Sequence, residues 1–213
     1  MKATDACIHP LPAGDSSAGR LAVEAGELGF DSIIMPGCRG FSQDSVQVLQ
    51  GYLIAEPTVK GVVGALRKCP SGPVVVLVNA GDLAFNRAVL TMHGVHILRQ
   101  IARSPKHSLD HVAARTAAEK GIAIDIDIRP LWEARGAERH RILGKYERVL
   151  SLQRHFGFPC TLSSNAASVI DQRSVRALEG LCGLFGMNDG EVEEALASVG
   201  SILSRNGPVQ VVG

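Results

Sequence analysis

The sequence predicts an α/β protein with one domain over residues 1–213, folded as a TIM-like (β/α) barrel. Three observations predict this class. Short apolar runs alternate with helical patterns along the chain, which indicates mainly parallel strands joined by helical crossovers. No Gly-rich dinucleotide fingerprint follows the first strand, which favours a closed barrel over an open sheet. A chain of 213 residues, 46% of them hydrophobic, can bury one such core.

About eight strands and seven outer helices are expected in alternation. Segment 108–121 illustrates the reasoning: Ser108 can cap a helix, Asp110 lies in its first turn, and Lys120 and Gly121 end it. The strands are expected at 4–9, 32–36, 48–55, 74–79, 95–98, 122–128, 159–164 and 208–212. The helices are expected at 16–29, 57–68, 83–92, 108–120, 132–156, 174–185 and 189–204.

Composition excludes several classes of protein. Charged residues make up 20% of the chain, which is typical of a folded protein. No apolar run approaches the ~20 residues that span a bilayer, and no secretory leader is visible, so no membrane contact is expected. The five cysteines are scattered without a C-x-x-C pair, which favours reduced thiols and a cytoplasmic location. Aromatic residues, at 4%, are too few for a base-stacking platform.

Charge is unevenly distributed along the chain. Residues 97–176 contain 14 Lys and Arg against 8 Asp and Glu, a balance of +6, although the whole chain carries a formal net charge of only +1. The remaining residues therefore carry a balance of −5. This asymmetry suggests a basic face for a polyanion and a neutral-to-acidic face for another partner. Chance clustering on a solvated surface is the alternative.

The first strand raises the question of a metal site. The stretch TDACIH has the Asp and the last His of an Asp-x-His-x-His corner, but Cys7 stands at the first His position. A second acidic pair lies in IAIDIDI, where Asp125 and Asp127 fall on one side of a strand and the isoleucines on the other. These carboxylates could bind metal, act in acid/base chemistry, or pair with cations on neighbouring strands.

Barrel enzymes carry their chemistry where strands end and βα loops begin. This sequence places few metal ligands there, with one His and few acids that would converge. The polar residues expected at these ends are His9, Arg39, Glu56, Asn79, Asp82, Arg129, Ser163, Ser164 and Asn165. The spacing of the histidines in segment 93–111 matches no ligand motif.

Three segments carry a resemblance that covers nearly the whole chain. They read TDACIHP at 4–10, LDHVAARTAAEKGIAIDIDIRPL at 109–131 and TLSSNAASVIDQRSVRALEGLCGLFGM at 161–187. Together they resemble the archaeal ribonuclease P protein component 3 family, the thirty-kilodalton subunit shared with eukaryotes. The resemblance implies a TIM-like barrel related to the polymerase-and-histidinol-phosphatase hydrolases.

Followed through this chain, the hydrolase pattern implies a degenerate metal site. Two of its positions keep their ligand, while the others have become Cys, Leu, Asn and Ala. Leu and Ala cannot bind a metal, and a neutral Asn is a poor substitute for Asp. We therefore expect no catalytic residue and no bound cofactor in this chain. The positions concerned are Asp5, Cys7, His9, Leu53, Asn165 and Ala167.

The resemblance also implies a function and partners. In ribonuclease P the RNA cleaves precursor tRNA, with Mg²⁺ expected for the RNA catalyst, and proteins support that RNA. The family pairs with protein component 2 as a dimer of heterodimers and assembles with the other protein subunits. The alternatives are a metal-dependent phosphoesterase with a rewired centre at Cys7, His9, Asp125 and Asp127, and a stand-alone barrel that binds a small phosphate.

Basic residues near helix starts and on one long helix are the expected RNA contacts. Arg141, Lys145 and Arg148 form a stripe, and like charges at such spacing cost roughly 0.2–0.5 kcal/mol unless an anion offsets them. Arg173 and Arg176 are the first choice, because they fall in the most family-like loop. The other expected contacts are Arg87, Lys106, Arg115 and Arg129. A solvated face is the alternative throughout, and for Arg129 a structural role at the barrel rim.

Overall fold

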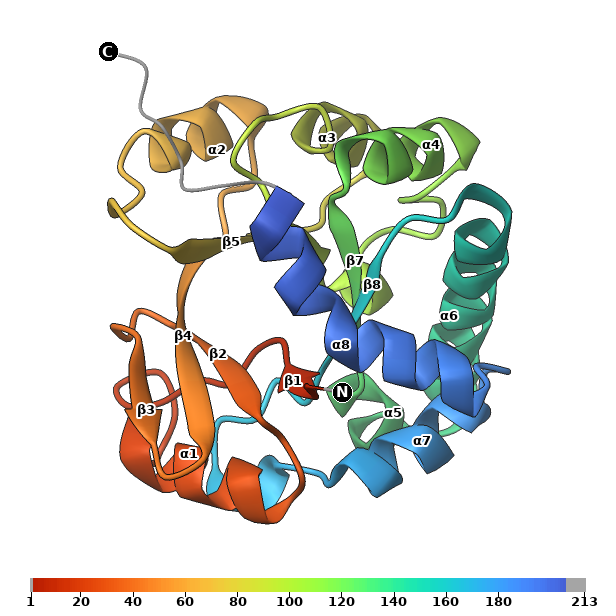
Figure 1. Cartoon of the computed structure of the whole chain (residues 1–213). Helices are drawn as coiled ribbons and strands as arrows, with labels where there is room; N and C mark the ends of the chain where they lie inside the picture. Colours follow the sequence, from red (N-terminus) through yellow and green to blue (C-terminus); the bar gives the residue numbers. More distant parts are fainter. Residues whose placement is uncertain (1, 206–213) are drawn as a thin grey trace.

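The computed structural model describes residues 2–205, so the strand expected at 208–212 lies outside the described residues. Seven parallel strands follow one another in the order β1-β2-β4-β5-β6-β7-β8, and helices surround them (Figure 1). Beyond β1, Ala6 N donates to Leu162 O over 2.9 Å and Ile8 bridges Ala166 in parallel register. These contacts join the first and last strands, so the sheet forms a nearly closed barrel. The predicted fold class is confirmed.

The expected order of elements is largely observed. The strands are β1 Thr4–Asp5, β2 Ser32–Pro36, β3 Phe41–Gln43, β4 Val46–Ile54, β5 Val74–Asn79, β6 Ile97–Arg99, β7 Ala123–Asp127 and β8 Cys160–Ser163. The α-helices are α1 Ala18–Glu27, α2 Val59–Leu66, α3 Leu83–Val89, α4 His111–Lys120, α5 Arg129–Glu133, α6 Gly136–Phe156, α7 Val175–Gly183 and α8 Asp189–Arg205. Two short 3₁₀ turns are η1 Ile101–Arg103 and η2 Val169–Asp171.

Side-chain caps fix where several helices begin. Ser17, Thr58, Asp82 and Ser174 each accept a hydrogen bond from the backbone N–H three residues later, at the starts of α1, α2, α3 and α7. Helix α4 begins later than predicted, because its cap is Asp110, whose Oδ1 accepts from Ala113 N, and not Ser108. It ends as predicted at Gly121, which has a left-handed φ of 66°.

One strand was not predicted, and one helix prediction was wrong. No element was expected between residues 36 and 48, but the connection from β2 to its parallel neighbour β4 holds an antiparallel strand, β3, that pairs with β4. The helix expected at 132–156 is broken between α5 and α6. Ala134 and Arg135 are extended there, with ψ of 149° and 159°, and Gly136 takes a left-handed φ of 55°. The good helix formers on both sides hide this break in the sequence pattern.

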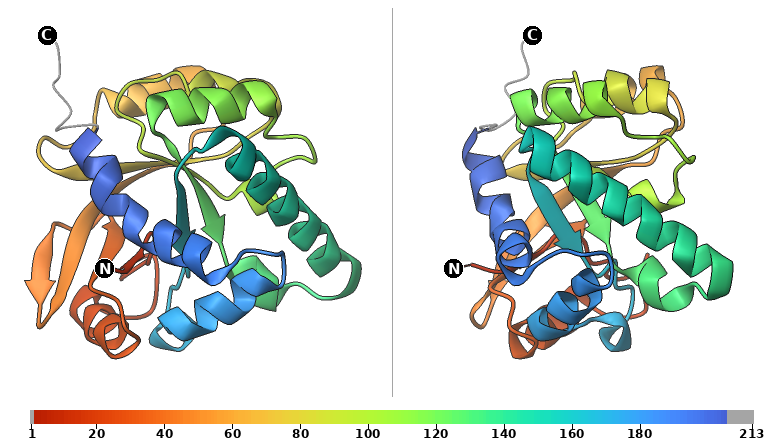
Figure 2. Two further views of the ribbon diagram at one scale, coloured as in Figure 1. Left: turned by 45° about the vertical axis from the view of Figure 1, so that its right-hand side comes forward. Right: turned by 90° about the vertical axis from the view of Figure 1, so that its right-hand side faces the viewer.

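The apolar side chains form two clusters. The larger one fills the space between the sheet and the surrounding helices, with α2, α3 and α4 side by side on one flank (Figure 2). The smaller one lies inside the barrel, where Val75, Ile97 and Ala123 from the strand starts meet Val199 and Ile202 of α8. Helix α8 thus closes the amino-terminal end of the barrel, and polar residues occupy the carboxyl-terminal end. No helix within 2–205 has the length and hydropathy to cross a membrane.

Candidate functional site

A polar cluster fills the carboxyl-terminal end of the barrel interior. It draws on four strands and the loops that follow them, so residues distant in sequence meet there. Every member is at most 7% exposed, apart from the half-buried His9. The members are Asp5, Cys7, His9, Arg99, Asp125, Asp127 and Asn165.

Arg99, the last residue of β6, lies at the centre of this cluster. Its side chain is fully buried, and its Nη2 donates a hydrogen bond of 2.7 Å to Oδ1 of Asn165. The carboxyl groups of Asp5, Asp125 and Asp127 are near enough to attract its charge, although it forms no ion pair within residues 2–205. Its Nε and Nη1 have no hydrogen-bond partner within the same residues. A fixed protein cation therefore lies among these buried acidic side chains.

Backbone geometry presents Arg99 and Asn165 to each other. Gln100, directly after Arg99, has a left-handed φ of 61°, and Asn165 itself has φ of 51°. Such values are uncommon for residues other than glycine and often occur at ligand sites and in tight turns. Both turn the chain sharply at the ends of β6 and β8, so that each side chain points into the barrel.

Asn165 connects the cluster through both ends of its amide. Its Oδ1 accepts from Arg99 and lies 2.6 Å from Nε2 of His9, while its Nδ2 donates to Oδ2 of Asp127 over 3.1 Å. Burial lowers the pKa of His9, which favours the neutral ring, and because the amide oxygen of Asn165 can only accept, Nε2–H of His9 is the donor. Cys7 Sγ lies 3.5 Å from the same Nε2.

The acidic side chains are protonated more readily than in water. Burial raises the pKa of Asp5 to about 7, although its Oδ1 accepts from the backbone N–H groups of Cys7 and Ser164, each over 3.1 Å. Burial likewise raises the pKa of Asp127 to about 7 and raises that of Asp125. The Cys7 thiol has a pKa of about 12 for the same reason, and so remains neutral.

Most of the carboxyl oxygens that a metal ion would need are engaged in hydrogen bonds, although Oδ2 of Asp5 has no partner within residues 2–205. Asp125 accepts hydrogen bonds from Thr161 Oγ1 at 2.9 Å and from Ser163 Oγ at 2.7 Å, so the predicted pair of carboxylates faces hydroxyl groups and Arg99. Within the described chain, no three His, Cys, Asp or Glu side chains are arranged to hold a metal. Leu53, at the position of a hydrolase Glu, packs beside the apolar interior.

The remaining residues expected at the strand ends lie outside the polar cluster. Asp82 caps α3, with its Oδ1 2.8 Å from Phe85 N. Asn79 is half-buried, and its Oδ1 has no partner within residues 2–205. Arg39 and Glu56 are exposed. None of these four belongs to the polar cluster around Arg99.

Arg129 joins the rim of the barrel through four contacts. Its Nε lies 2.5 Å from Oε1 of Glu133, and its Nη1 donates to Asn165 O over 3.0 Å and lies 3.5 Å from Asp171. Its backbone N–H donates to Oδ1 of Asp127 over 3.0 Å. These are the contacts that a structural rim arginine would make, and the guanidinium is only a quarter exposed.

The expected RNA-binding stripe on α6 is present, but its members differ. Arg141 is exposed and only loosely paired with Glu138, at 3.9 Å. Lys145 is half-buried, and its Nζ donates to the carbonyl oxygens of Ala102, at 2.9 Å, and Ser104. Arg148 is exposed, and its Nη1 donates to Nδ1 of His107 over 2.8 Å. Arg141 and Arg148 are therefore the members that solvent or an anion can reach.

Two further expected contacts flank the start of α7. Arg173 donates to the carbonyl oxygens of Ile170 and Gln172, at 2.9 and 2.7 Å, and its guanidinium lies 4.6 Å from the ring centre of Trp132. Arg176 is exposed on α7 and forms no ion pair within residues 2–205.

The other three expected contacts lie around α4. Arg87 forms an ion pair with Asp110, the residue that caps α4. Arg115 lies on α4 with its guanidinium 6.0 Å from the ring centre of Phe156. Lys106 is exposed in the loop that precedes α4. Together with the stripe on α6, these residues lie around the packed helices α4 and α6, a surface that we call the basic side and that is separate from Arg173 and Arg176 in the sequence.

Sequence reasoning missed Arg99. The only signal is its position directly after the apolar run VHIL, at the end of a predicted strand. An arginine there usually snorkels to solvent, so its full burial follows only from the acidic side chains that the barrel brings together.

Comparison with known proteins agrees with this geometry. The model of the family described as RNase P subunit p30 matches residues 2–208. Ribonuclease P protein component 3 of Methanosarcina mazei is 31% identical over 96% of this chain and 90% of its own length. The protein of the same name from Methanothermobacter thermautotrophicus is 28% identical over 89% of this chain and 82% of its own length.

Two solved structures share the fold. A chain in the cryo-EM structure of archaeal ribonuclease P with mature tRNA superposes with a TM-score of 0.76 at 20% identity, covering 98% of both chains. The histidinol phosphate phosphatase of Lactococcus lactis, solved with zinc, L-histidinol and phosphate, gives 0.63 at 15% identity over 88% of this chain and 95% of its own. The predicted resemblance is confirmed: this chain belongs to the RNase P subunit p30 family.

Proposed function

We propose that this protein binds and supports the catalytic RNA of ribonuclease P in the 5′ maturation of precursor tRNA, and that it cleaves no RNA by itself. Membership of the RNase P subunit p30 family carries the first half of the proposal. The buried Arg99 carries the second. A buried guanidinium near the carboxylates offers them the positive charge that metal ions supply in a hydrolytic barrel, which argues against a metal-activated water there.

The basic side formed by α4, α6 and the loop before α4 supports the contact with RNA. A polyanion binds through cations placed against its phosphates, which needs no deep catalytic pocket. The accessible cations on this side include Lys106, Arg115, Arg141 and Arg148, and Arg176 lies at a second position on α7. We propose these residues as contacts, and Arg173 and Arg129 as residues that shape the loops carrying them.

The partners are proposed from the relatives. A chain of similar fold is present in archaeal ribonuclease P with mature tRNA, so the RNA and its other protein subunits are the proposed partners here. We further propose that the protein pairs with component 2 as a dimer of heterodimers, acts in the cytoplasm, and leaves Mg²⁺ binding to the RNA. Light scattering of the mixture with component 2 tests the pairing, since two independent monomer peaks at micromolar concentration would contradict it.

Reconstitution tests the central proposal. Cleavage of precursor tRNA is measured with the RNA and the other protein components, with and without this chain. We expect the chain to increase cleavage and to show none alone with Mg²⁺, Mn²⁺ or Zn²⁺. Turnover that follows the isolated protein through purification, and that a His9→Ala variant loses, would establish the alternative phosphoesterase. Stoichiometric transition metal lost from a Cys7→Ser variant would support the same conclusion.

A further inference from the structure

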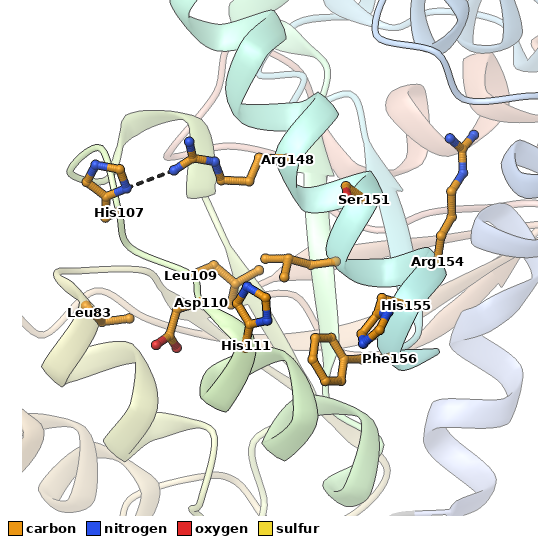
Figure 3. Close-up of a pocket in the computed structure, with 11 residues that line it drawn as sticks. Leu83, His107, Leu109, Asp110, His111, Arg148, Ser151, Arg154, His155 and Phe156 are labelled. Atoms are coloured by element: carbon orange, nitrogen blue, oxygen red, sulfur yellow. Dashed lines mark hydrogen bonds between the residues drawn. The ribbon is translucent and has the colours of Figure 1, made fainter.

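A cleft of about 690 Å³ lies on the basic side, between α6 and the start of α4, with the loop that precedes α4 forming one lip (Figure 3). Its lining includes the apolar side chains of Leu83, Leu109 and Leu152. At one end Arg148 donates to His107 over 2.8 Å, and in Figure 3 this pair lies apart from the ring cluster at the other end. The volume falls within the range of small-ligand sites.

Aromatic rings form the other end of the cleft. The ring centres of His111 and Phe156 are 5.8 Å apart, and those of His155 and Phe156 are 4.6 Å apart. Both pairs meet edge to face, at 82° and 78°, so the rings do not stack on one another. His111 and His155 are exposed to solvent. A flat ligand can therefore reach these two rings from solvent.

A second hollow of about 380 Å³ adjoins the first and shares Leu109, Arg148 and Leu152 with it. Its lining includes Lys106 and Arg141. Arg148 thus stands between an aromatic cleft and a basic hollow. A strand that leaves the first cleft past Arg148 would meet further cations for its next phosphates.

The charges of the first cleft favour an anion at Arg148. The acidic side chain in its lining, Asp110, is already engaged by Arg87 and by Ala113 N. Arg154 lies at the edge of the cleft, but Glu191 binds it through two hydrogen bonds of 2.6 and 2.9 Å. Arg148 donates to Nδ1 of His107 and forms no ion pair within residues 2–205, so no carboxylate compensates its positive charge there.

We propose that this cleft takes one unpaired nucleotide of the RNA, with its base against His111, His155 and Phe156 and its phosphate at Arg148. The inference rests on the proposed function and names the part of the RNA that this side recognises. In a double helix the faces of the bases are stacked, so only an unpaired base can enter. An acidic peptide would satisfy Arg148 but would leave the apolar and aromatic lining without a partner.

The test uses the full chain and a fluorescent single-stranded RNA octamer of mixed sequence, at low salt. The comparison probes are an RNA duplex of the same length, an abasic octamer, and a hexaglutamate peptide as competitor. Three variants are compared with the wild type: His111→Ala/His155→Ala, Arg148→Ala and, as a control, Arg139→Ala, whose side chain lies on α6 but lines neither hollow. Thermal melting checks that each variant is folded.

We expect the octamer to bind more tightly than the abasic probe and the duplex. The double histidine variant should bind the octamer about tenfold more weakly, because the base loses the aromatic rings on which it stacks. Its affinity for the abasic probe should not change. Arg148→Ala should weaken binding of both single strands and reduce the slope of log affinity against log salt by about 0.7. The Arg139→Ala control should change less than Arg148→Ala.

The inference fails if the octamer and the abasic probe bind alike, if no saturable binding of the octamer is seen, or if hexaglutamate displaces the octamer from wild type and from the histidine variant equally. A 4-thiouridine octamer gives an independent readout, because it should crosslink to segments 107–111 or 151–156, and crosslinks elsewhere would overturn the assignment. The proposed function is tested separately, by whether omission of this chain lowers cleavage of precursor tRNA in the reconstituted enzyme. The two failures are therefore distinguishable.

Discussion

Arg99 donates a hydrogen bond of 2.7 Å to Oδ1 of Asn165, across a sequence separation of 66 residues. The same amide donates from Nδ2 to Asp127 over 3.1 Å. A neutral amide can accept from a cation and donate to a carboxylate at once, whereas a carboxylate at position 165 could only accept. The asparagine, which is a poor metal ligand, is thus well suited to link a buried arginine to a buried aspartate.

We predict that Asn165→Asp destabilises the protein by about 1–3 kcal/mol at pH 8, because it replaces the donor to Asp127 with a second buried acceptor. The loss should shrink at pH 5, where protonation of one acid restores a donor. Urea unfolding at both pH values measures it. Asn188→Asp is the matched control, since Asn188 caps α8 on the surface and Asp caps equally well. Equal stability of both variants would contradict the linking role.

Arg99→Met should be the most damaging of the single changes considered. It removes the cation near Asp5, Asp125 and Asp127, and at pH 8, above the raised pKa of Asp5 and Asp127, an unpaired buried charge costs about 3–5 kcal/mol. Chemical denaturation measures the free energy of unfolding. Arg103→Met is the control, because its side chain is 55% exposed and its contact with Glu133 is a long 3.7 Å. An Arg99→Met variant as stable as this control would show that the central cation is dispensable.

The buried Asp5 predicts a pH dependence of stability. Burial raises its pKa from 3.8 in the unfolded chain to about 7 in the folded one, so between these values the folded state holds a proton that the unfolded state has released. Its stabilising contribution is complete below the lower value and is lost as the pH rises through about 7. We expect the unfolding free energy of the wild type to fall between pH 5 and pH 8.

Asp5→Asn should reduce this dependence but not abolish it, because the amide does not titrate, whereas Asp127, whose pKa is also raised to about 7, still does. Asp44→Asn, at an exposed turn residue, is the control and should keep the slope of the wild type. The measurement is a series of urea titrations across this range. A slope that survives Asp5→Asn unchanged would assign the dependence to another group.

Much of the barrel follows from local signals. Apolar runs and helix caps predict most strands and the order of the helices, because each depends on a few neighbouring residues. The β3 strand and the break before α6 do not follow. The first depends on pairing with β4, and the second on extended conformations at Ala134 and Arg135 that the local propensities do not favour.

The sequence identified several residues of the polar cluster, but not the arginine at its centre. The degenerate motif at Asp5, Cys7 and His9 follows from residue types, and the structure places these residues with Asn165 as the pattern implies. Arg99 does not follow, because its burial depends on acids contributed by other strands. The sequence also cannot show that Lys145 donates its hydrogen bonds to backbone carbonyl oxygens, because these belong to a distant segment.

Variants of Lys145 and Arg141 should differ in stability, because the first cation is held by backbone carbonyl oxygens and the second is exposed to solvent. Lys145 donates to Ala102 O over 2.9 Å and also to Ser104 O, which holds the segment before α4 against α6. We predict that Lys145→Met costs about 1 kcal/mol of stability, while Arg141→Met leaves it unchanged. Differential scanning calorimetry of both variants and the wild type measures the difference. If both variants melt like the wild type, the contact of Lys145 does not fix this segment.

Arg173 and Arg176 provide the corresponding contrast at α7. Arg173 stacks 4.6 Å from the Trp132 ring and binds two carbonyl oxygens of its own turn, whereas Arg176 is exposed. We predict that Arg173→Ala lowers the melting temperature by about 2–4 °C, the equivalent of about 1 kcal/mol in a chain of this size. Arg176→Ala should leave the melting temperature unchanged.

Binding to the ribonuclease P RNA should respond in the opposite order. A well-formed phosphate contact contributes about 1.5–3 kcal/mol, and its loss reduces the slope of log affinity against log salt by about 0.7–0.9. Arg176→Ala is expected to show both effects, because its guanidinium is free to reach a phosphate. Arg173→Ala should weaken binding only as far as its turn loosens, with the salt slope unchanged. A normal salt slope in Arg176→Ala and in the double variant would remove this loop from the RNA interface, while the contacts on α6 would remain to be judged by their own variants.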